Sequence, residues 1–295
     1  MEGMEYRKEF ASYGKRITLL WGAFIVCLVF TATISMWLGS IVGDRVAFIL
    51  VSSAVQNVCV FMLPAFLVAY FITTQPVSFL GLTSRVSWRQ VLFVIGVVVL
   101  SMPALNYIVY LNEAIDLPDS PIEEWLRSTE AAARAVTDEL MKADSAGMLV
   151  MTVLVAGVLT GLGEELFFRG AQQRIFMLRG INGHVAVWVT AIIFSLLHFQ
   201  FYGFIPRMLL GAFFGYLAWK GGSLWLPIIA HALNNSLAVV FGSMSHQGVA
   251  SMQWLNTCGV PSDGNFPFMA LLSAVATAAF IVCGKKLLVG GAVVK

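Results

Sequence analysis

Charged residues are scarce in this chain of 295 residues. Asp, Glu, Lys and Arg together make up 12% of it, whereas hydrophobic residues make up 59% and the mean hydropathy is +0.83. A soluble domain needs about 25% charged residues to cover its surface, so this composition excludes an ordinary soluble protein. The formal net charge of +2 gives no argument for a nucleic-acid partner. The composition therefore predicts an all-α polytopic membrane protein.

Cysteine motifs are also missing. The four cysteines form no CxxC pair, so neither a disulfide framework nor a zinc ribbon is expected. A removable signal peptide is not expected either, because the polar first 16 residues have no cleavage site behind them. The first apolar run is therefore predicted to be a retained span.

Long apolar runs, by contrast, are abundant. A helix needs about 20 apolar residues to cross a bilayer, and helices satisfy their own backbone hydrogen bonds there. The sequence predicts about eight transmembrane helices, at 17–38, 48–72, 91–111, 148–168, 184–199, 204–219, 223–241 and 266–284. We expect three regions: an N-terminal three-span region (1–147), a four-span core (148–241), and a loop with the last span (242–295).

The basic residues are distributed unevenly about these spans. Five of the 18 fall on one side, namely Arg45, Arg127, Arg134, Lys142 and Arg207, and the rest fall on the other. Because cytoplasmic loops carry the excess of Lys and Arg, both termini are predicted to be cytoplasmic. The expected location is a cell membrane, taken to be a prokaryotic plasma membrane.

The connection 112–147 is the most polar part of the chain, with nine acidic and three basic residues. Ser120 and Glu123 form a capping-box pattern, with Pro121 at the first helical position. The segment therefore predicts one non-cytoplasmic amphipathic helix at about 120–143. This helix could be a solvated connector, or it could be a lid or a surface that recruits substrate.

Only two acidic residues lie in a predicted span, and they are adjacent: Glu164 and Glu165. An ionised side chain at the centre of a bilayer costs about 2.5–3.5 kcal/mol even on the lenient insertion scale, so a polar partner is expected. Arg169 lies four residues after Glu165, one helical turn away, and can pair with it.

Three further polar residues lie at membrane depth on two other predicted helices: His198, His231 and Asn235. A purely structural role could explain one polar residue in the membrane, but it explains polar residues on three separate helices much less easily. A carboxylate beside imidazoles can activate water as a general base, and an imidazole with an amide can stabilise an oxyanion. Because no serine or cysteine has an obvious place as nucleophile, attack by water is favoured.

A metal site is the alternative use of the same residues. Glu164, His198 and His231 could bind zinc or another divalent ion and leave a position for water. The sequence contains no HExxH motif, so the spacing gives this alternative no direct support.

At these residues the chain resembles the CPBP family of intramembrane proteases, the CAAX-protease and bacteriocin-processing or Abi family, which includes the type II CAAX prenyl endopeptidases. Its pattern of EExxxR, FxxxH and HxxxN is similar to the motifs that end at Arg169, His198 and Asn235. The resemblance covers roughly residues 145–240.

The resemblance implies an endopeptidase that acts on a membrane protein or peptide in the lipid bilayer. Glu164 would be the general base and His198 would assist it. Glu165 with Arg169 would support the site, and His231 with Asn235 would form the oxyanion pocket. It favours a mechanism without a cofactor.

Two other functions stay open on the sequence. Polar groups at mid-depth also mark transporters and channels, although no inverted repeat is visible. A non-catalytic immunity or scaffold protein could keep the fold. The predicted spans also place Glu164 near the cytoplasmic end of its helix and His198 near the opposite end. A single site therefore requires tilted helices or different helix boundaries.

Overall fold

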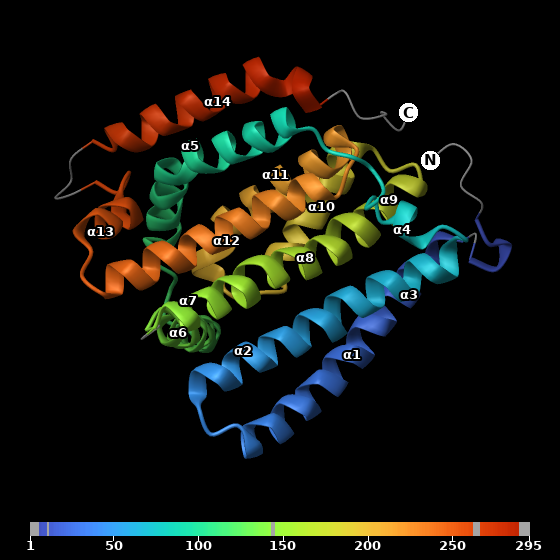
Figure 1. The fold of residues 1–295 in the computed structure, drawn as a ribbon, viewed down its shortest axis with the longest axis horizontal. Coiled ribbons are helices and arrows are strands. Elements are labelled where there is room, and N and C mark those ends of the chain that lie inside the picture. Colours follow the sequence, from blue (N-terminus) through green and yellow to red (C-terminus); the bar gives the residue numbers. More distant parts are fainter. Residues whose placement is uncertain (1–5, 11, 143–144, 262–265, 289–295) are drawn as a thin grey trace.

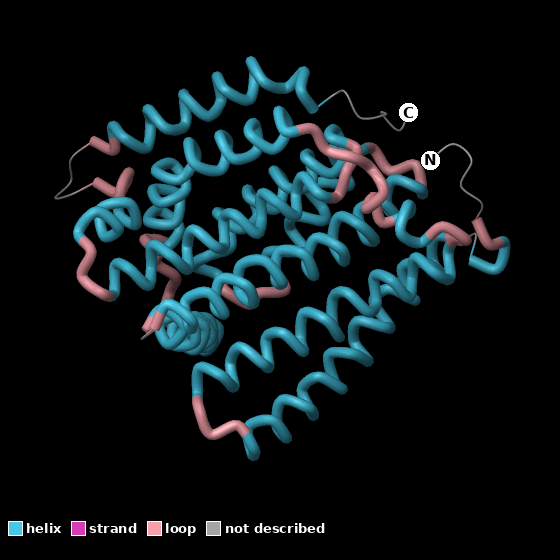
Figure 2. Tube along the Cα trace, viewed as in Figure 1, coloured by secondary structure: helices cyan, strands magenta, loops and turns pink. Residues whose placement is uncertain are grey.

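The computed structural model describes residues 6–10, 12–142, 145–261 and 266–288. Helices make up nearly all of this part, and most of them run side by side along one direction (Figures 1 and 2). The only β-type pairing in the described residues is an isolated bridge between Tyr6 and Thr73. The predicted all-α fold is confirmed.

Within the residues that the structure describes, seven helical segments are long and apolar enough to cross a membrane, which makes this a multi-pass membrane protein. They are α1 (Tyr13–Ile41), α2–α3 (Arg45–Ile72), α5 (Trp88–Glu113), α7–α9 (Ala146–Leu178), α11 with the short turn before it (Phe201–Gly221), α12 (Trp225–His246) and α14 (Phe268–Leu288).

The predicted fifth span differs from the prediction. It is the helix α10 (Gly183–Leu196), whose 14 residues extend about 21 Å, short of the roughly 30 Å of a bilayer core. The helix still reverses the chain between α9 and α11. The start of α1 and the end of α14 consequently lie at the same end of the bundle (Figure 1).

The predicted fourth span, 148–168, is too short. Helix α7–α9 continues for ten more residues, to Leu178. The added part is polar in sequence, but Arg169, Gln172 and Gln173 in it are buried inside the protein. Two π-helical segments, Val153–Leu159 and Leu166–Gln172, interrupt the helix on either side of α8 (Thr160–Glu165).

The acidic connection forms the predicted amphipathic helix, α6 (Pro121–Met141). It lies across one end of the bundle and is seen nearly end-on in Figure 1. Ser120 caps it by accepting a hydrogen bond from the backbone N–H of Glu123. The side chain of Glu123 pairs with Arg127. The remaining short helices are α4 (Pro76–Phe79) and α13 (Ala250–Thr257), with 3₁₀ turns at Lys8–Phe10 and Phe201–Gly203.

Glycines bring the helices around the polar residues into close contact. A Cβ atom on Gly161 of α8 would lie 2.8 Å from the backbone nitrogen of Ala232 in α12. A Cβ atom on Gly211 of α11 would lie 3.3 Å from the Cα of Ala191 in α10. Small residues at such positions let backbones approach, which places side chains of α8, α10, α11 and α12 within mutual reach.

Candidate active site

Glu165 forms the centre of a buried polar cluster. Its side chain has no exposed surface, and its Oε1 accepts from Arg169 Nη1 at 2.6 Å and pairs with His231 Nδ1 at 2.8 Å. The predicted pairing of Glu165 with Arg169 is confirmed. A charge buried away from water needs such partners, because it would otherwise destabilise the fold.

Arg169 contacts residues of two neighbouring helices. It is fully buried, and its Nη2 donates to the carbonyl oxygen of Gly211 at 2.8 Å. The guanidinium carbon lies 4.7 Å from the ring centroid of Phe194 and 5.5 Å from that of Phe214, a cation–π arrangement. These contacts tie the helix α7–α9 to α10 and α11, so Arg169 fixes the position of Glu165 relative to both neighbouring helices.

His231 of α12 lies between the two glutamates. The Glu165 carboxylate is paired with Arg169 and therefore accepts, so the hydrogen on His231 is placed on Nδ1. The other nitrogen, Nε2, lies 3.7 Å from Glu164 Oε2. The ring stacks on Phe214, with the centroids 4.8 Å apart. The hydrogen bond between Nδ1 and Glu165 and the stacking on Phe214 together direct Nε2 toward Glu164.

His198 lies two residues beyond the end of α10. Its Nδ1 lies 2.8 Å from the carbonyl oxygen of Phe194 and donates to it, since a carbonyl only accepts. This leaves Nε2 as an acceptor. Phe199, directly after it, adopts the left-handed backbone conformation with φ +53°, which is uncommon for a residue with a side chain. The chain therefore turns sharply at the histidine.

The longer helix explains how His198 and Glu164 reach the same depth. Glu164 lies 14 residues before the end of α9, or about 21 Å along the helix. His198 follows the start of α10 by 15 residues, or about 22 Å on the way back. The depth mismatch expected from the sequence came from ending the helix at residue 168.

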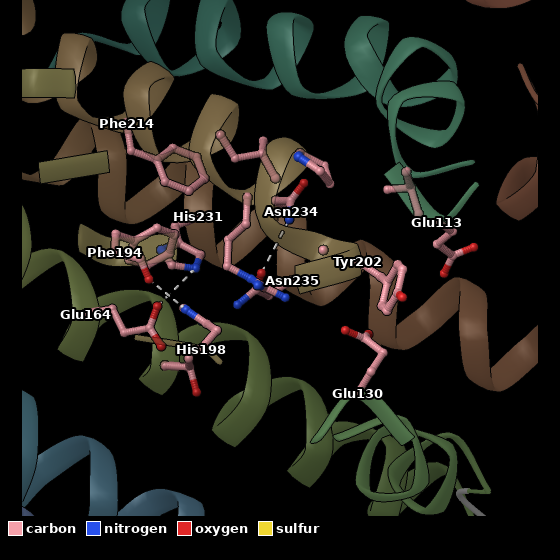
Figure 3. Close-up of a pocket in the computed structure, with 16 residues that line it drawn as sticks. Glu113, Glu130, Glu164, Phe194, His198, Tyr202, Phe214, His231, Asn234 and Asn235 are labelled. Atoms are coloured by element: carbon pink, nitrogen blue, oxygen red, sulfur yellow. Dashed lines mark hydrogen bonds and ion pairs between the residues drawn. The ribbon is translucent and has the colours of Figure 1, made fainter. Parts of the chain in front are cut away.

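A cavity of about 360 Å³ lies among these helices (Figure 3). Four of the six predicted site residues line it: Glu164, His198, His231 and Asn235. The other two, Glu165 and Arg169, lie behind its wall and do not reach it. The adjacent glutamates thus differ in access, with Glu164 open to the cavity and Glu165 closed off.

Asn234, which the motifs did not single out, also lines the cavity. Asn234 Nδ2 donates to Asn235 Oδ1 at 3.3 Å, and Asn235 Nδ2 donates to the carbonyl oxygen of Ala156 at 3.4 Å. Because consecutive residues of an α-helix point about 100° apart, the cavity curves around more of α12 than one helical face.

The sequence analysis did not assign a role to the further lining residues, all of which except Phe194 of the FxxxH motif lie outside the three motifs. They are Val109, Glu113, Glu130, Thr160, Phe194, Tyr202, Gly203, Pro206, Arg207, Leu210 and Phe214. Arg207 carried a usable signal, since it is the only charged residue in the apolar run 204–219. Glu130 belongs to α6, so this helix covers the end of the cavity.

Metal ligation was the alternative for Glu164, His198 and His231. Throughout the described ranges, no group of three or more His, Cys, Asp or Glu side chains is arranged to hold a metal ion. The three residues share the cavity but do not form a ligand cluster. The mechanism below is therefore derived from the side chains alone.

Comparisons with known proteins give one family match. Residues 146–237 match the family model described as Rce1-like, type II CAAX prenyl endopeptidase Rce1-like. No curated protein and no solved structure gives a significant match. The matched segment contains all six predicted site residues, from Glu164 to Asn235, together with α8, α10, α11 and the first part of α12. Through residues 146–237, about a third of its length, the chain is similar to the type II CAAX prenyl endopeptidases.

Proposed function

We propose that this protein is an intramembrane endopeptidase that hydrolyses a peptide bond in a membrane-associated protein or peptide. One observation carries the proposal. Glu164, His198, His231 and Asn235 come from three helices and line one cavity in a protease-family segment. Carboxylate, imidazole and amide are the groups that activation of water and stabilisation of an oxyanion require.

In the first step, a water molecule binds between Glu164 and Nε2 of His198. Glu164 removes one proton as the water oxygen bonds to the carbonyl carbon of the substrate, and the carbonyl oxygen takes up the negative charge. His198 Nε2 accepts the hydrogen bond of the other water hydrogen. The bond from His198 Nδ1 to the Phe194 carbonyl keeps that acceptor oriented.

His231 and Asn235 stabilise the oxyanion. Since Nδ1 of His231 is committed to Glu165, its Nε2 can donate only when the ring is protonated. The hydrogen bond to Glu165 behind the ring holds Nε2 on the side of Glu164. In the second step the C–N bond breaks, Glu164 passes its proton to the leaving amine, and the products are a carboxylic acid and an amine.

The membrane orientation follows from the distribution of basic residues. We place both termini in the cytoplasm and α6 on the opposite side. The cavity reaches the end of the bundle that α6 covers, through Glu113 and Glu130. A connector and a lid remain alternatives for α6, and the proposed chemistry needs neither.

Peptide profiling of membranes tests the function and identifies the substrate. Membranes from cells with the wild-type protein should contain peptide fragments that are missing in cells with Glu164→Ala, and the intact precursors should accumulate. Glu124→Ala is the matched control, because Glu124 is exposed on α6 and does not line the cavity. Identical profiles for wild type and Glu164→Ala, at equal amounts of inserted protein, would contradict the proposal.

Removal of divalent metals is expected to leave the activity unchanged. The described residues offer no cluster that could hold an ion, and the proposed water activation needs only Glu164 and His198. The measurement is cleavage of the identified substrate by purified protein before and after dialysis against a chelator. A loss of activity that added zinc restores would instead support the metal alternative.

A further inference from the structure

Arg207 of α11 is the only Lys or Arg among the described residues that line the cavity. Its Nη2 donates to the side-chain oxygen of Gln200 at 2.7 Å. Its Nη1 is shielded from solvent and has no hydrogen-bond partner. A guanidinium carries five N–H donors, and the two on Nη1 have no partner among the described residues.

The charge of Arg207 is not neutralised by an ion pair in the described part of the chain. Glu130 and Glu164 are close enough to interact with it electrostatically, but neither lies within ion-pair distance. A partly buried charge without an ion-pair partner attracts a counter-charge. The planar fork of arginine fits a carboxylate through two parallel hydrogen bonds.

From this geometry we infer that Arg207 binds a carboxylate of the substrate and selects peptides that carry one near the scissile bond. The inference rests on the proposed function and names a substrate class for the same site. The carboxylate could belong to an Asp or Glu side chain or to a peptide C-terminus. Both sources offer the same chemistry to the guanidinium.

The position of Arg207 defines where that carboxylate lies. Phe214, which stacks on His231, follows Arg207 by seven residues on α11 and lines the same cavity. Seven helical residues span about 10 Å. An extended peptide covers this distance in about three residues. The carboxylate therefore lies two to four residues from the bond that Glu164 and His231 surround.

Gly203 leaves space for the guanidinium of Arg207. A Cβ atom on Gly203 would lie 2.8 Å from Nη2 of Arg207, so any side chain there would displace the end of the arginine. Gly203→Ala consequently moves the charge without removing it. This provides a variant that separates the placement of the guanidinium from its presence.

Binding to the Glu164→Gln protein tests the inference without relying on cleavage. The probes are three fluorescein-labelled apolar decapeptides in detergent: one with a C-terminal carboxylate, one with a C-terminal amide, and one amide-terminated with Glu third from the end. Fluorescence anisotropy should show at least one carboxylate probe bound tenfold or more tightly than the plain amide. Arg207→Gln should abolish this preference, and Arg207→Lys and Gly203→Ala should reduce it.

Arg45→Gln, the same charge change at an exposed residue outside the cavity, should keep the preference. If all three probes bind alike, or if Arg207→Gln keeps the preference, the inference is overturned. After that result the proposed function would still hold, provided that cleavage by the wild type depends on Glu164. Absence of any cleavage by the wild type would refute the proposed function, while the binding comparison would still decide the role of Arg207.

Discussion

Glu164→Gln is expected to slow peptide hydrolysis by about 10³-fold, near the middle of the range of about 10²–10⁴ for loss of a general acid–base residue. Glutamine keeps the size of the side chain and can still contact the cavity, but it cannot take a proton from water. Glu164 is the residue to change because its carboxylate lines the cavity whereas that of Glu165 has no exposed surface. The measurement is kcat on the substrate identified by profiling.

The control is Glu124→Gln, which removes a carboxylate outside the cavity and should keep the wild-type kcat. Equal thermal melting of both variants in detergent would show that the loss is chemical. If Glu164→Gln retained more than a tenth of the wild-type kcat, a different base would have to be sought.

Arg169→Met should lower the free energy of unfolding by about 3–5 kcal/mol, the usual cost of removing one partner from a buried ion pair. The substitution leaves the Glu165 carboxylate buried with only His231 as a partner. It also removes the hydrogen bond to the Gly211 carbonyl, which joins the helix α7–α9 to α11. Unfolding by a denaturing detergent, followed by loss of helical circular dichroism, would measure the change.

The double variant Arg169→Met with Glu165→Gln separates charge from packing. Removing both charges should recover part of the stability lost in the single variant, because no uncompensated charge is left. It should not recover activity, because His231 loses the carboxylate that orients its ring. If the double variant were as unstable as the two single losses added together, the pair would not be coupled and the assigned role of Arg169 would be wrong.

Four of the residues that line the cavity could be found from the sequence because they are polar residues within apolar runs. In an apolar run, a carboxylate or an imidazole is costly enough to need a reason, so Glu164, His198 and His231 stand out without any structure. The pairing of Glu165 with Arg169 followed from helical spacing alone. These predictions rest on local rules, which hold for an isolated helix as well as for a folded protein.

Prediction from the sequence was wrong where the result depends on which face of a helix packs against other helices. The hydropathy pattern placed the end of the fourth span at residue 168, because the polar residues Arg169, Gln172 and Gln173 were expected to face water. These three side chains are buried against neighbouring helices. Asn234 was missed for the related reason that only the packing of α12 shows how far the cavity extends, whereas Arg207 could have been noticed as the only charged residue in the run 204–219.

The cavity is small and Glu164 is recessed in it. The cavity holds about 360 Å³, and the side chain of Glu164 is 10% exposed. In an intact α-helix the backbone carbonyls are hydrogen-bonded and lie beneath the side chains. We therefore expect a membrane-spanning substrate to unwind locally before its peptide bond reaches Glu164, and the ease of that unwinding becomes part of the selectivity. Segments with glycine or proline near the cleaved bond would enter more readily than uninterrupted leucine-rich helices.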